Sequence, residues 1–140
     1  MSVWVEPKTN WNGNEDEYFN IVPDYQRIKG NIEFLGEYAN IFGFDRNNLY
    51  TMENVTLQTR PTPSFANNIV YNIDVLKNFF GDYITGYRNM KTYVEKGNIW
   101  NYNDLNIIEK NTLVIKQKLD SMYLTKEKLP FIQLGIANLL

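Results

Sequence analysis

The chain has 140 residues, with 14 basic and 16 acidic side chains and a formal net charge of −2. This length fits one domain that buries roughly 70% of its unfolded surface, and the near-neutral charge argues against a nucleic-acid partner or an anionic membrane surface. Cysteine and histidine are both absent, which excludes disulfides, thiolate metal sites and the commonest general base.

The N-terminal stretch has no basic flank followed by an apolar segment, which is the pattern of a secretory signal. No apolar run approaches the roughly 18 to 20 residues that span a bilayer. We therefore expect a soluble protein made in the cytoplasm, with no membrane partner.

Apolar residues recur at spacings of three, four, three and four in three segments, which places them on one face of a helix. The three stripes are Tyr25, Ile28, Ile32, Leu35, Ala39; then Ala66, Ile69, Ile73, Leu76, Phe80; then Leu105, Ile108, Thr112, Ile115, Leu119. One such helix is not stable alone in water, so the stripes should face each other or a neighbouring subunit.

The three stripes also form a weak internal repeat. Their second members, Ile28, Ile69 and Ile108, lie 41 and then 39 residues apart, and an asparagine follows each by three residues: Asn31, Asn72 and Asn111. The chain has twenty asparagines, so a boundary position filled by composition is one interpretation. The alternative is an amide that binds backbone in an adjoining arm or subunit and fixes the register.

Polar residues mark the expected helix starts. Asn20 precedes the first stripe, and Thr62 precedes Pro63, whose ring suits the first turn of a helix. Asn101 stands three residues before Asp104, so a cap is followed by an acid in the first turn, where the helix dipole favours it.

Helices are therefore expected at about 21–42, 63–81 and 102–122, with Gly43 and Gly81 at the ends of the first two. The third should fade before Pro130. The fold prediction is a single, mainly α domain: a small three-helix repeat with extended arms at about 1–20, 44–62 and 84–100.

Short strands are an option within two of the arms. Val55, Leu57 and Thr59 alternate in one of them, and Tyr93 and Val94 lie in the other. The apolar segment 129–140 is a strand or a short helix, and the pattern leaves open whether it belongs to the core or to an interface.

The sequence contains few of the residue combinations that catalysis or cofactor binding requires. The serines, Ser2, Ser64 and Ser121, have no histidine to activate them. The run Glu15, Asp16 and Glu17 suggests a carboxylate pair for hydrolysis, but a solvated acidic loop explains it better, and the oxygen ligands of a calcium loop are missing. No phosphate-binding glycine loop is present. We predict no enzyme activity, no cofactor and no metal.

Two further groups of residues have competing interpretations. Four lysines occur between 116 and 128, but acids interrupt them, so a solvated helix face is favoured over a nucleic-acid site.

Trp4, Trp11 and Trp100 flank the helices and serve either as local core caps or as anchors for a partner.

The segment 7–35 resembles a segment of tail and baseplate proteins from bacteriophages of low-GC Gram-positive bacteria. The resemblance rests on Lys8-Thr9-Asn10-Trp11, on Tyr18-Phe19-Asn20 and on the helix pattern from Asp24 to Leu35. The stretch 91–111, KTYVEKGNIWNYNDLNIIEKN, is similar to a second phrase of these proteins, and 59–76 fits more loosely.

This resemblance implies a non-enzymatic virion component that works as a multimer with other tail or baseplate proteins, its arms gripping neighbouring subunits. Many such proteins continue into fibre or host-binding domains, so this 140-residue chain is expected to be an adaptor or attachment protein rather than a receptor binder. A phage-tail-like bacteriocin would use the same part. The interface or register candidates are Trp4, Trp11, Tyr18, Phe19, Tyr25, Arg27, Asn31, Asn72, Trp100 and Asn111.

Two other functions remain as alternatives. One is a free cytoplasmic helical module that binds another protein. The other is a carboxylate-based hydrolase that uses the cluster from Glu15 to Glu17.

Overall fold

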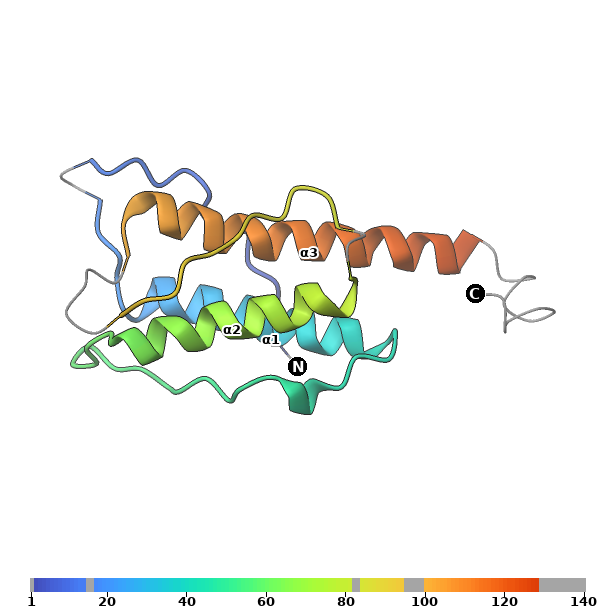
Figure 1. Cartoon of the computed structure of the whole chain (residues 1–140), viewed down its shortest axis with the longest axis horizontal. Coiled ribbons are helices and arrows are strands. Elements are labelled where there is room, and N and C mark those ends of the chain that lie inside the picture. Colours follow the sequence, from blue (N-terminus) through green and yellow to red (C-terminus); the bar gives the residue numbers. More distant parts are fainter. Residues whose placement is uncertain (1, 15–16, 82–83, 95–99, 129–140) are drawn as a thin grey trace.

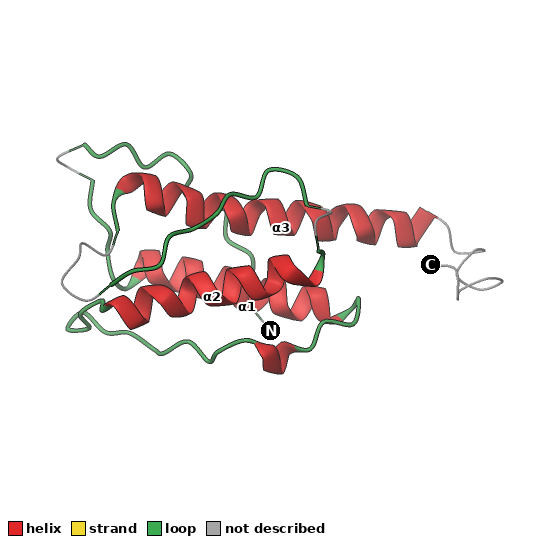
Figure 2. Ribbon diagram, viewed as in Figure 1, coloured by secondary structure: helices red, strands yellow, loops and turns green. Residues whose placement is uncertain are grey.

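A computed structural model describes residues 2–14, 17–81, 84–94 and 100–128. These residues form α1 (Pro23–Asn40), the short 3-10 helix η1 (Arg46–Asn48), α2 (Pro63–Phe79) and α3 (Tyr102–Lys128), and the described part contains no strand (Figure 2). The predicted mainly α class is confirmed.

The three long helices are parallel. In Figure 1 each runs from the left of the view to the right, and an extended segment returns alongside the bundle before the next helix begins. The aromatic rings near the helix starts meet accordingly, with ring centroids 4.4 Å apart for Tyr25 and Phe65 and 6.0 Å apart for Phe65 and Trp100. We call the extended segments arm 1 (2–14), arm 2 (44–62) and arm 3 (84–94).

The core lies where the three apolar stripes meet along the bundle axis, and each helix contacts the other two. The central side chains are almost completely shielded from solvent: Ile28, Ile32, Leu35, Ile69, Ile73, Leu76, Ile108, Ile115 and Leu119. Burying each such side chain contributes about 1.5–3 kcal/mol, so the shared core stabilises helices that would not form alone.

Two of the three predicted helix caps are correct. Thr62 Oγ1 accepts a hydrogen bond from the Phe65 N–H (3.2 Å), and the side chains of Asn101 and Asp104 accept hydrogen bonds from each other's N–H groups (2.9 and 3.3 Å). The Asn20 cap is wrong. Asp24 Oδ2 instead accepts from the Asn20 N–H (2.7 Å), because a turn already precedes Pro23 and puts Asn20 outside the helix.

The helix ends differ from prediction mainly in α3. Gly43 and Gly81 follow α1 and α2 with φ of 102° and 63°, values that favour glycine. α3 continues to Lys128, six residues beyond the expected end at 122, because residues 121–128 contain no helix breaker and several good helix formers. The apolar stripe ends at Leu119, so the stripe alone underestimates the helix.

The strand options in the arms are also wrong. Residues 55–59 are extended backbone with a turn at 57–58, and Tyr93 and Val94 lie in extended arm 3. These arms hydrogen-bond to helix side chains rather than to a neighbouring backbone, so no ladder forms. The prediction for 129–140 lies outside the described residues.

Candidate functional site

The three repeated asparagines bind the backbone of the arms. Asn31 Oδ1 accepts from the Val5 N–H (2.9 Å), and its Nδ2 donates to the Val5 carbonyl (2.7 Å). Asn72 forms the same pair with Tyr50 (2.8 and 3.0 Å). In this arrangement one side-chain amide binds both the backbone N–H and the backbone C=O of one arm residue. We call it a backbone clamp.

Asn111 completes this first set of clamps on α3. Its Oδ1 accepts from the Arg88 N–H (3.0 Å), and its Nδ2 donates to the Arg88 carbonyl (2.8 Å). Asn31, Asn72 and Asn111 are almost fully buried, so an amide without partners at any of the three would incur a large desolvation cost.

Two more asparagines make a second set of clamps. Asn106 holds Trp11 (2.8 and 2.7 Å), and Asn67 holds Tyr93 (2.8 and 3.0 Å). Both lie two residues before the repeat isoleucines, Ile108 and Ile69. The apolar stripes did not predict this pair, because both asparagines lie outside them, yet Asn67 and Asn106 align when the repeat is extended by two residues.

The clamps follow a cyclic order around the bundle. Arm 1 is held by α1 and α3, and arm 3 by α3 and α2. Arm 2 is held by α2 at Asn72 and by α1 through the Tyr25 hydroxyl, which donates to the Glu53 carbonyl (2.8 Å). Each arm therefore bridges the helix that follows it and one neighbour, which gives the chain an approximate threefold arrangement.

The contact between α1 and arm 2 replaces a clamp with a tyrosine. Gln26 occupies the position equivalent to Asn67 and Asn106, and its side chain is exposed. Tyr25, next to it, is 1% exposed, and burial raises the pKa of its phenol to about 12, with smaller contributions from the charges of Glu53 and Glu33. A tyrosine hydroxyl of α1 thus makes the contact with the arm that an asparagine amide makes in the other two repeats.

A buried ion pair adds to the attachment of arm 1. Arg27 binds the Glu109 carboxylate through two nitrogens (2.7 and 2.8 Å) and Asp24 through a third (2.8 Å). Glu109 also accepts from the Lys8 N–H and the Trp11 indole N–H, both at 3.0 Å. The hydrogen bond to Glu109 raises the pKa of Arg27 above its ordinary value. Four donors surround this carboxylate and offset the cost of burying its charge.

The aromatic candidates have different environments. Trp11 is 5% exposed and belongs to the core, whereas Trp4 and Trp100 are half-buried and pack at its edge. Phe19 packs against Trp100 (ring centroids 4.6 Å apart), and Tyr18 is exposed. The structure thus brings Trp11, Phe19, Trp100 and Tyr25 together near the helix starts and leaves Tyr18 outside.

Glu17, from the acidic run at 15–17, is bound to hydrogen-bond donors. Glu17 accepts from the Asn12 N–H (2.8 Å) and pairs with Lys8 (2.9 Å), and these contacts, the first foremost, lower its pKa. Glu15 and Asp16 lie outside the described residues. Within the described ranges, no group of three acidic side chains is arranged to hold a metal ion.

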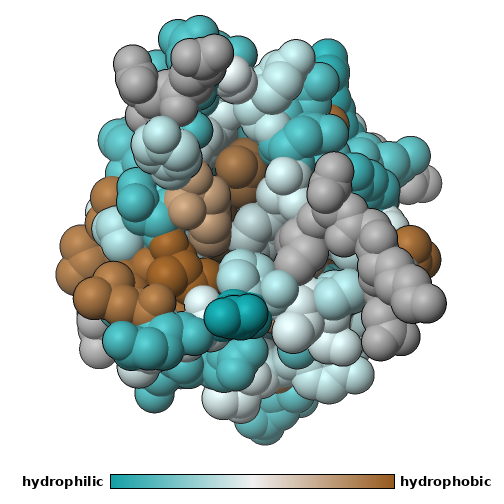
Figure 3. Space-filling view, turned by 90° about the vertical axis from the view of Figure 1, so that its left-hand side faces the viewer, coloured by the Kyte–Doolittle hydropathy of each residue, from teal (hydrophilic) through white to brown (hydrophobic). Residues whose placement is uncertain are grey.

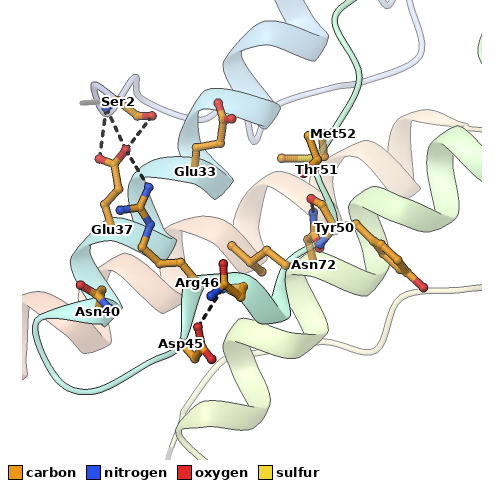
Figure 4. A pocket seen from close by; sticks show the side chains of 12 residues that line it. Ser2, Glu33, Glu37, Asn40, Asp45, Arg46, Tyr50, Thr51, Met52 and Asn72 are labelled. Atoms are coloured by element: carbon orange, nitrogen blue, oxygen red, sulfur yellow. Dashed lines mark hydrogen bonds and ion pairs between the residues drawn. The ribbon is translucent and has the colours of Figure 1, made fainter.

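A polar pocket of about 490 Å³ opens between α1, η1 and arm 2 (Figure 4). Glu37 faces Ser2 in this pocket and accepts from its N–H (3.1 and 3.2 Å), with Arg46 Nη2 at 3.9 Å. Asp45 accepts from the Asn47 N–H (3.0 Å). These carboxylates hold arm 1 and η1 in place, and the Ser2 hydroxyl also donates to Glu37 (3.3 Å).

A smaller apolar hollow lies where α1 ends and α3 continues. Phe34, Tyr38 and Ile41 on the α1 side and Tyr123 on α3 line a space of about 210 Å³, with Glu37 at its edge. Ile41 is 54% exposed and Tyr123 41% exposed. We call this space the apolar notch.

Comparisons with known proteins add nothing to these observations, since no protein family, no curated protein and no solved structure matches the chain. Among the described residues, none of the helices has the length and apolar character needed to cross a membrane.

Proposed function

We propose that the chain is a non-enzymatic structural component of a bacteriophage tail or baseplate, or of a related bacteriocin particle, and serves as an adaptor between other tail proteins. The observation that carries this proposal is the set of backbone clamps. Five buried or half-buried amides fix the arms, and the described acidic groups at the centre of the fold are bound to donors rather than free to react.

The residues behind the resemblance support this proposal. Trp11, Arg27 and Asn31 come from its quoted motifs, and in the fold Trp11 and Arg27 both bind Glu109 while Asn31 clamps arm 1. Glu109 itself lies in the second quoted stretch, 91–111. The motifs therefore describe one connected structural unit, which fits a shared scaffold better than a shared reaction.

The arms in the described region bind their own bundle, so their backbone is not what grips neighbouring subunits. Their outward side chains are available instead: Val3 is 75% exposed on arm 1, and Val94 is 69% exposed on arm 3. Apolar residues also gather on part of the surface at the end where the helices begin (Figure 3). A fixed backbone with apolar side chains outward is preorganised for binding and loses little entropy on association.

The first test is particle association. We expect the chain to co-purify with tail particles from the bacterium that carries its gene, at a constant ratio to other tail proteins, as measured by quantitative mass spectrometry. Recovery of the chain only in the soluble fraction would contradict the proposal. The presence or absence of packaged DNA in the same particles separates a phage from a bacteriocin.

The second test maps the interface. A chain carrying Val3→Glu and Val94→Glu should keep its helical circular dichroism but be depleted from particles in competition with the unchanged protein, because charges on the outer faces of the arms oppose docking. Asn68→Glu is the matched control, since Asn68 is an exposed residue of α2 rather than of an arm. Equal incorporation of both variants into particles would show that the outer faces of the arms are not the docking interface.

The alternative, a free helical binding module, is favoured by one observation: the contacts between arms and helices close within a single chain. It requires a stable monomer at high concentration with no affinity for tail proteins. Sedimentation of the purified chain, alone and with particles lacking it, distinguishes the two.

A further inference from the structure

Asn12 and Gly13 form the one asparagine–glycine pair in the sequence. The pair lies near the end of arm 1, directly after Trp11, and both residues are exposed to solvent. In such a pair the backbone nitrogen of the glycine can reach the side-chain amide carbon of the asparagine, because no side chain on the second residue obstructs the approach. The surroundings of the pair decide whether this reaction is favoured.

The fold requires glycine at position 13. Its φ is 76°, in the left-handed region, and a Cβ atom there would lie 2.7 Å from the Tyr102 ring at the start of α3. Any larger residue at 13 would therefore be strained and would also collide with this ring. The close packing of arm 1 on α3 thus keeps a reactive neighbour beside Asn12.

Hydrogen bonds at the pair support an attack by the Gly13 nitrogen. Asn12 Oδ1 accepts from the Asn14 N–H (3.0 Å), which polarises the amide carbon and stabilises negative charge developing on this oxygen. The Gly13 N–H, which must lose its proton, donates to Glu17 Oε1 (3.3 Å). Hydrogen bonds from the Asn12 N–H and then from Lys8 lower the pKa of Glu17, so its carboxylate is ionised and able to accept.

Water has access to these groups. Asn12, Asn14 and Glu17 line a polar pocket of about 340 Å³, together with Lys8, Tyr18 and Asn20. Asn12 and Asn14 are both exposed. The pocket therefore admits the water that completes the reaction.

We propose that Asn12 is a site of self-modification by deamidation. The Gly13 nitrogen forms a bond to the Asn12 amide carbon, and the bond from that carbon to Nδ2 breaks. The proton of the Gly13 N–H passes through Glu17 to the leaving nitrogen, which departs as ammonia. The remaining succinimide is opened by water to aspartate or isoaspartate.

The products alter the end of arm 1. Each adds a negative charge close to Glu17, and isoaspartate also inserts one carbon into the backbone directly after Trp11, whose N–H and C=O are held by Asn106. The modification therefore acts beside a backbone clamp. It does not rest on the proposed function, because it needs only the residues of this chain and water.

Incubation of the purified full chain at mildly alkaline pH, followed by peptide mapping with mass spectrometry, tests the site. We expect the amide of Asn12 to be lost while the other asparagines keep theirs, with isoaspartate detected by enzymatic methylation. Isoaspartate forms only through the succinimide, so aspartate alone at position 12 would overturn the proposed route. An intact Asn12 amide after prolonged incubation would overturn the site itself.

Three variants test the roles of the neighbours, with circular dichroism as the check on folding. Asn12→Ser keeps an oxygen for the Asn14 N–H but has no amide, and it should abolish isoaspartate formation. Glu17→Gln should slow the loss of the Asn12 amide several-fold. Lys8→Gln breaks the same ion pair but keeps the carboxylate, so the rate should stay nearly unchanged. Equal slowing in Lys8→Gln, or no slowing in Glu17→Gln, would overturn the assignment of Glu17 as the proton acceptor.

Discussion

Asparagine is the residue that suits the backbone clamps. Its amide carries a donor and an acceptor at one end of a short side chain, which matches the N–H and C=O of one extended residue. Aspartate only accepts, and glutamine is one carbon longer. In a helix interior asparagine costs up to about 0.7 kcal/mol relative to alanine, whereas each net hydrogen bond contributes about 0.5–1.5 kcal/mol. The clamps at Asn31, Asn72 and Asn111 are therefore favourable despite a poor helix former.

Removing one clamp should be costly. We expect Asn72→Ala to lower the free energy of unfolding by about 2–4 kcal/mol, because it removes two hydrogen bonds and leaves polar groups of Tyr50 without their partner. Asn72→Asp should be at least as damaging, since it replaces a buried donor with a charge. Urea unfolding followed by circular dichroism measures both.

Asn68→Ala is the control for this prediction, because Asn68 lies on the same helix with an exposed side chain. Its change should stay within about 0.5 kcal/mol. Equal effects of Asn68→Ala and Asn72→Ala would mean that helix propensity, rather than the clamp, determines the cost.

The buried tyrosines predict a loss of stability in alkali. Burial raises the folded-state pKa of Tyr25 to about 12. Burial, and to a smaller extent the charges of nearby carboxylates, also raises the pKa values of Tyr38, Tyr87 and Tyr93. Below pH 10 both states keep these protons, so the stability is fully present. Above the ordinary pKa near 10 only the unfolded chain releases them, and each group then lowers the free energy of unfolding by up to about 1.4 kcal/mol per pH unit.

Chemical unfolding at a series of pH values between 9 and roughly 12 tests this expectation. Tyr25→Phe should show a shallower decline with pH, together with a smaller loss at neutral pH from its missing bond to the Glu53 carbonyl. Tyr102→Phe, at a half-exposed site, serves as the control. A decline of the same slope in the Tyr25 variant and the parent would contradict the assignment.

The arms differ in how they are attached to the helices. Arm 1 has the most extensive attachment, with clamps at Asn31 and Asn106 and two further bonds to Glu109. Arm 2 has one clamp and the Tyr25 hydroxyl. Gln26 accounts for this difference, since it stands where the other two repeats have an asparagine that clamps an arm, and its side chain is exposed.

Glu109→Gln should loosen arm 1 selectively. The substitution keeps the shape but removes the charge that Arg27 and the two arm donors share, and breaking a buried pair costs about 3–5 kcal/mol when the other charge remains buried. We expect the substitution to accelerate hydrogen exchange, relative to the parent protein, at the Lys8 and Trp11 amides and to leave exchange at the core amides of α2 nearly unchanged. Amide exchange read by nuclear magnetic resonance separates these sites.

The control for this element is Glu33→Gln, whose pair with Lys29 (3.4 Å) is at the surface and worth less than about 1 kcal/mol. Uniformly faster exchange over all three helices in Glu109→Gln would show a global destabilisation and contradict a selective effect on arm 1.

The sequence predicted those elements whose signal is local. The apolar stripes, two caps and the marked asparagines at 31, 72 and 111 follow from spacing within one helix. Glu109 gave no such signal, because its partners Lys8 and Arg27 lie 101 and 82 residues away along the chain. The strand options failed for a related reason: alternation shows that a segment is extended, but not whether a backbone or a side chain binds it.

At the scale of the whole molecule, the parallel arrangement depends on the arms. After α1 and after α2 the chain must run back along the bundle before the next helix can start at the same end. Arm 2 and arm 3 make these connections and are bound to helix side chains along the way. The clamps and the Tyr25 hydroxyl then join the helices in a closed cycle. Many of these contacts are remote in sequence, which favours slow and cooperative folding over helix-by-helix assembly.

This closed arrangement predicts a single unfolding transition. The tryptophans report on the arms and their surroundings, since Trp4 and Trp11 lie in arm 1 and Trp100 precedes α3, whereas far-ultraviolet circular dichroism reports on the helices. Because each arm bridges two helices, neither part should melt alone, and the fluorescence and dichroism curves in urea should coincide. Asn106→Ala with Glu109→Gln removes the attachment of arm 1 to α3 and should move the fluorescence midpoint below the dichroism midpoint. An unchanged coincidence in this variant, or separate curves in the parent, would show that the helices and arms are stabilised independently.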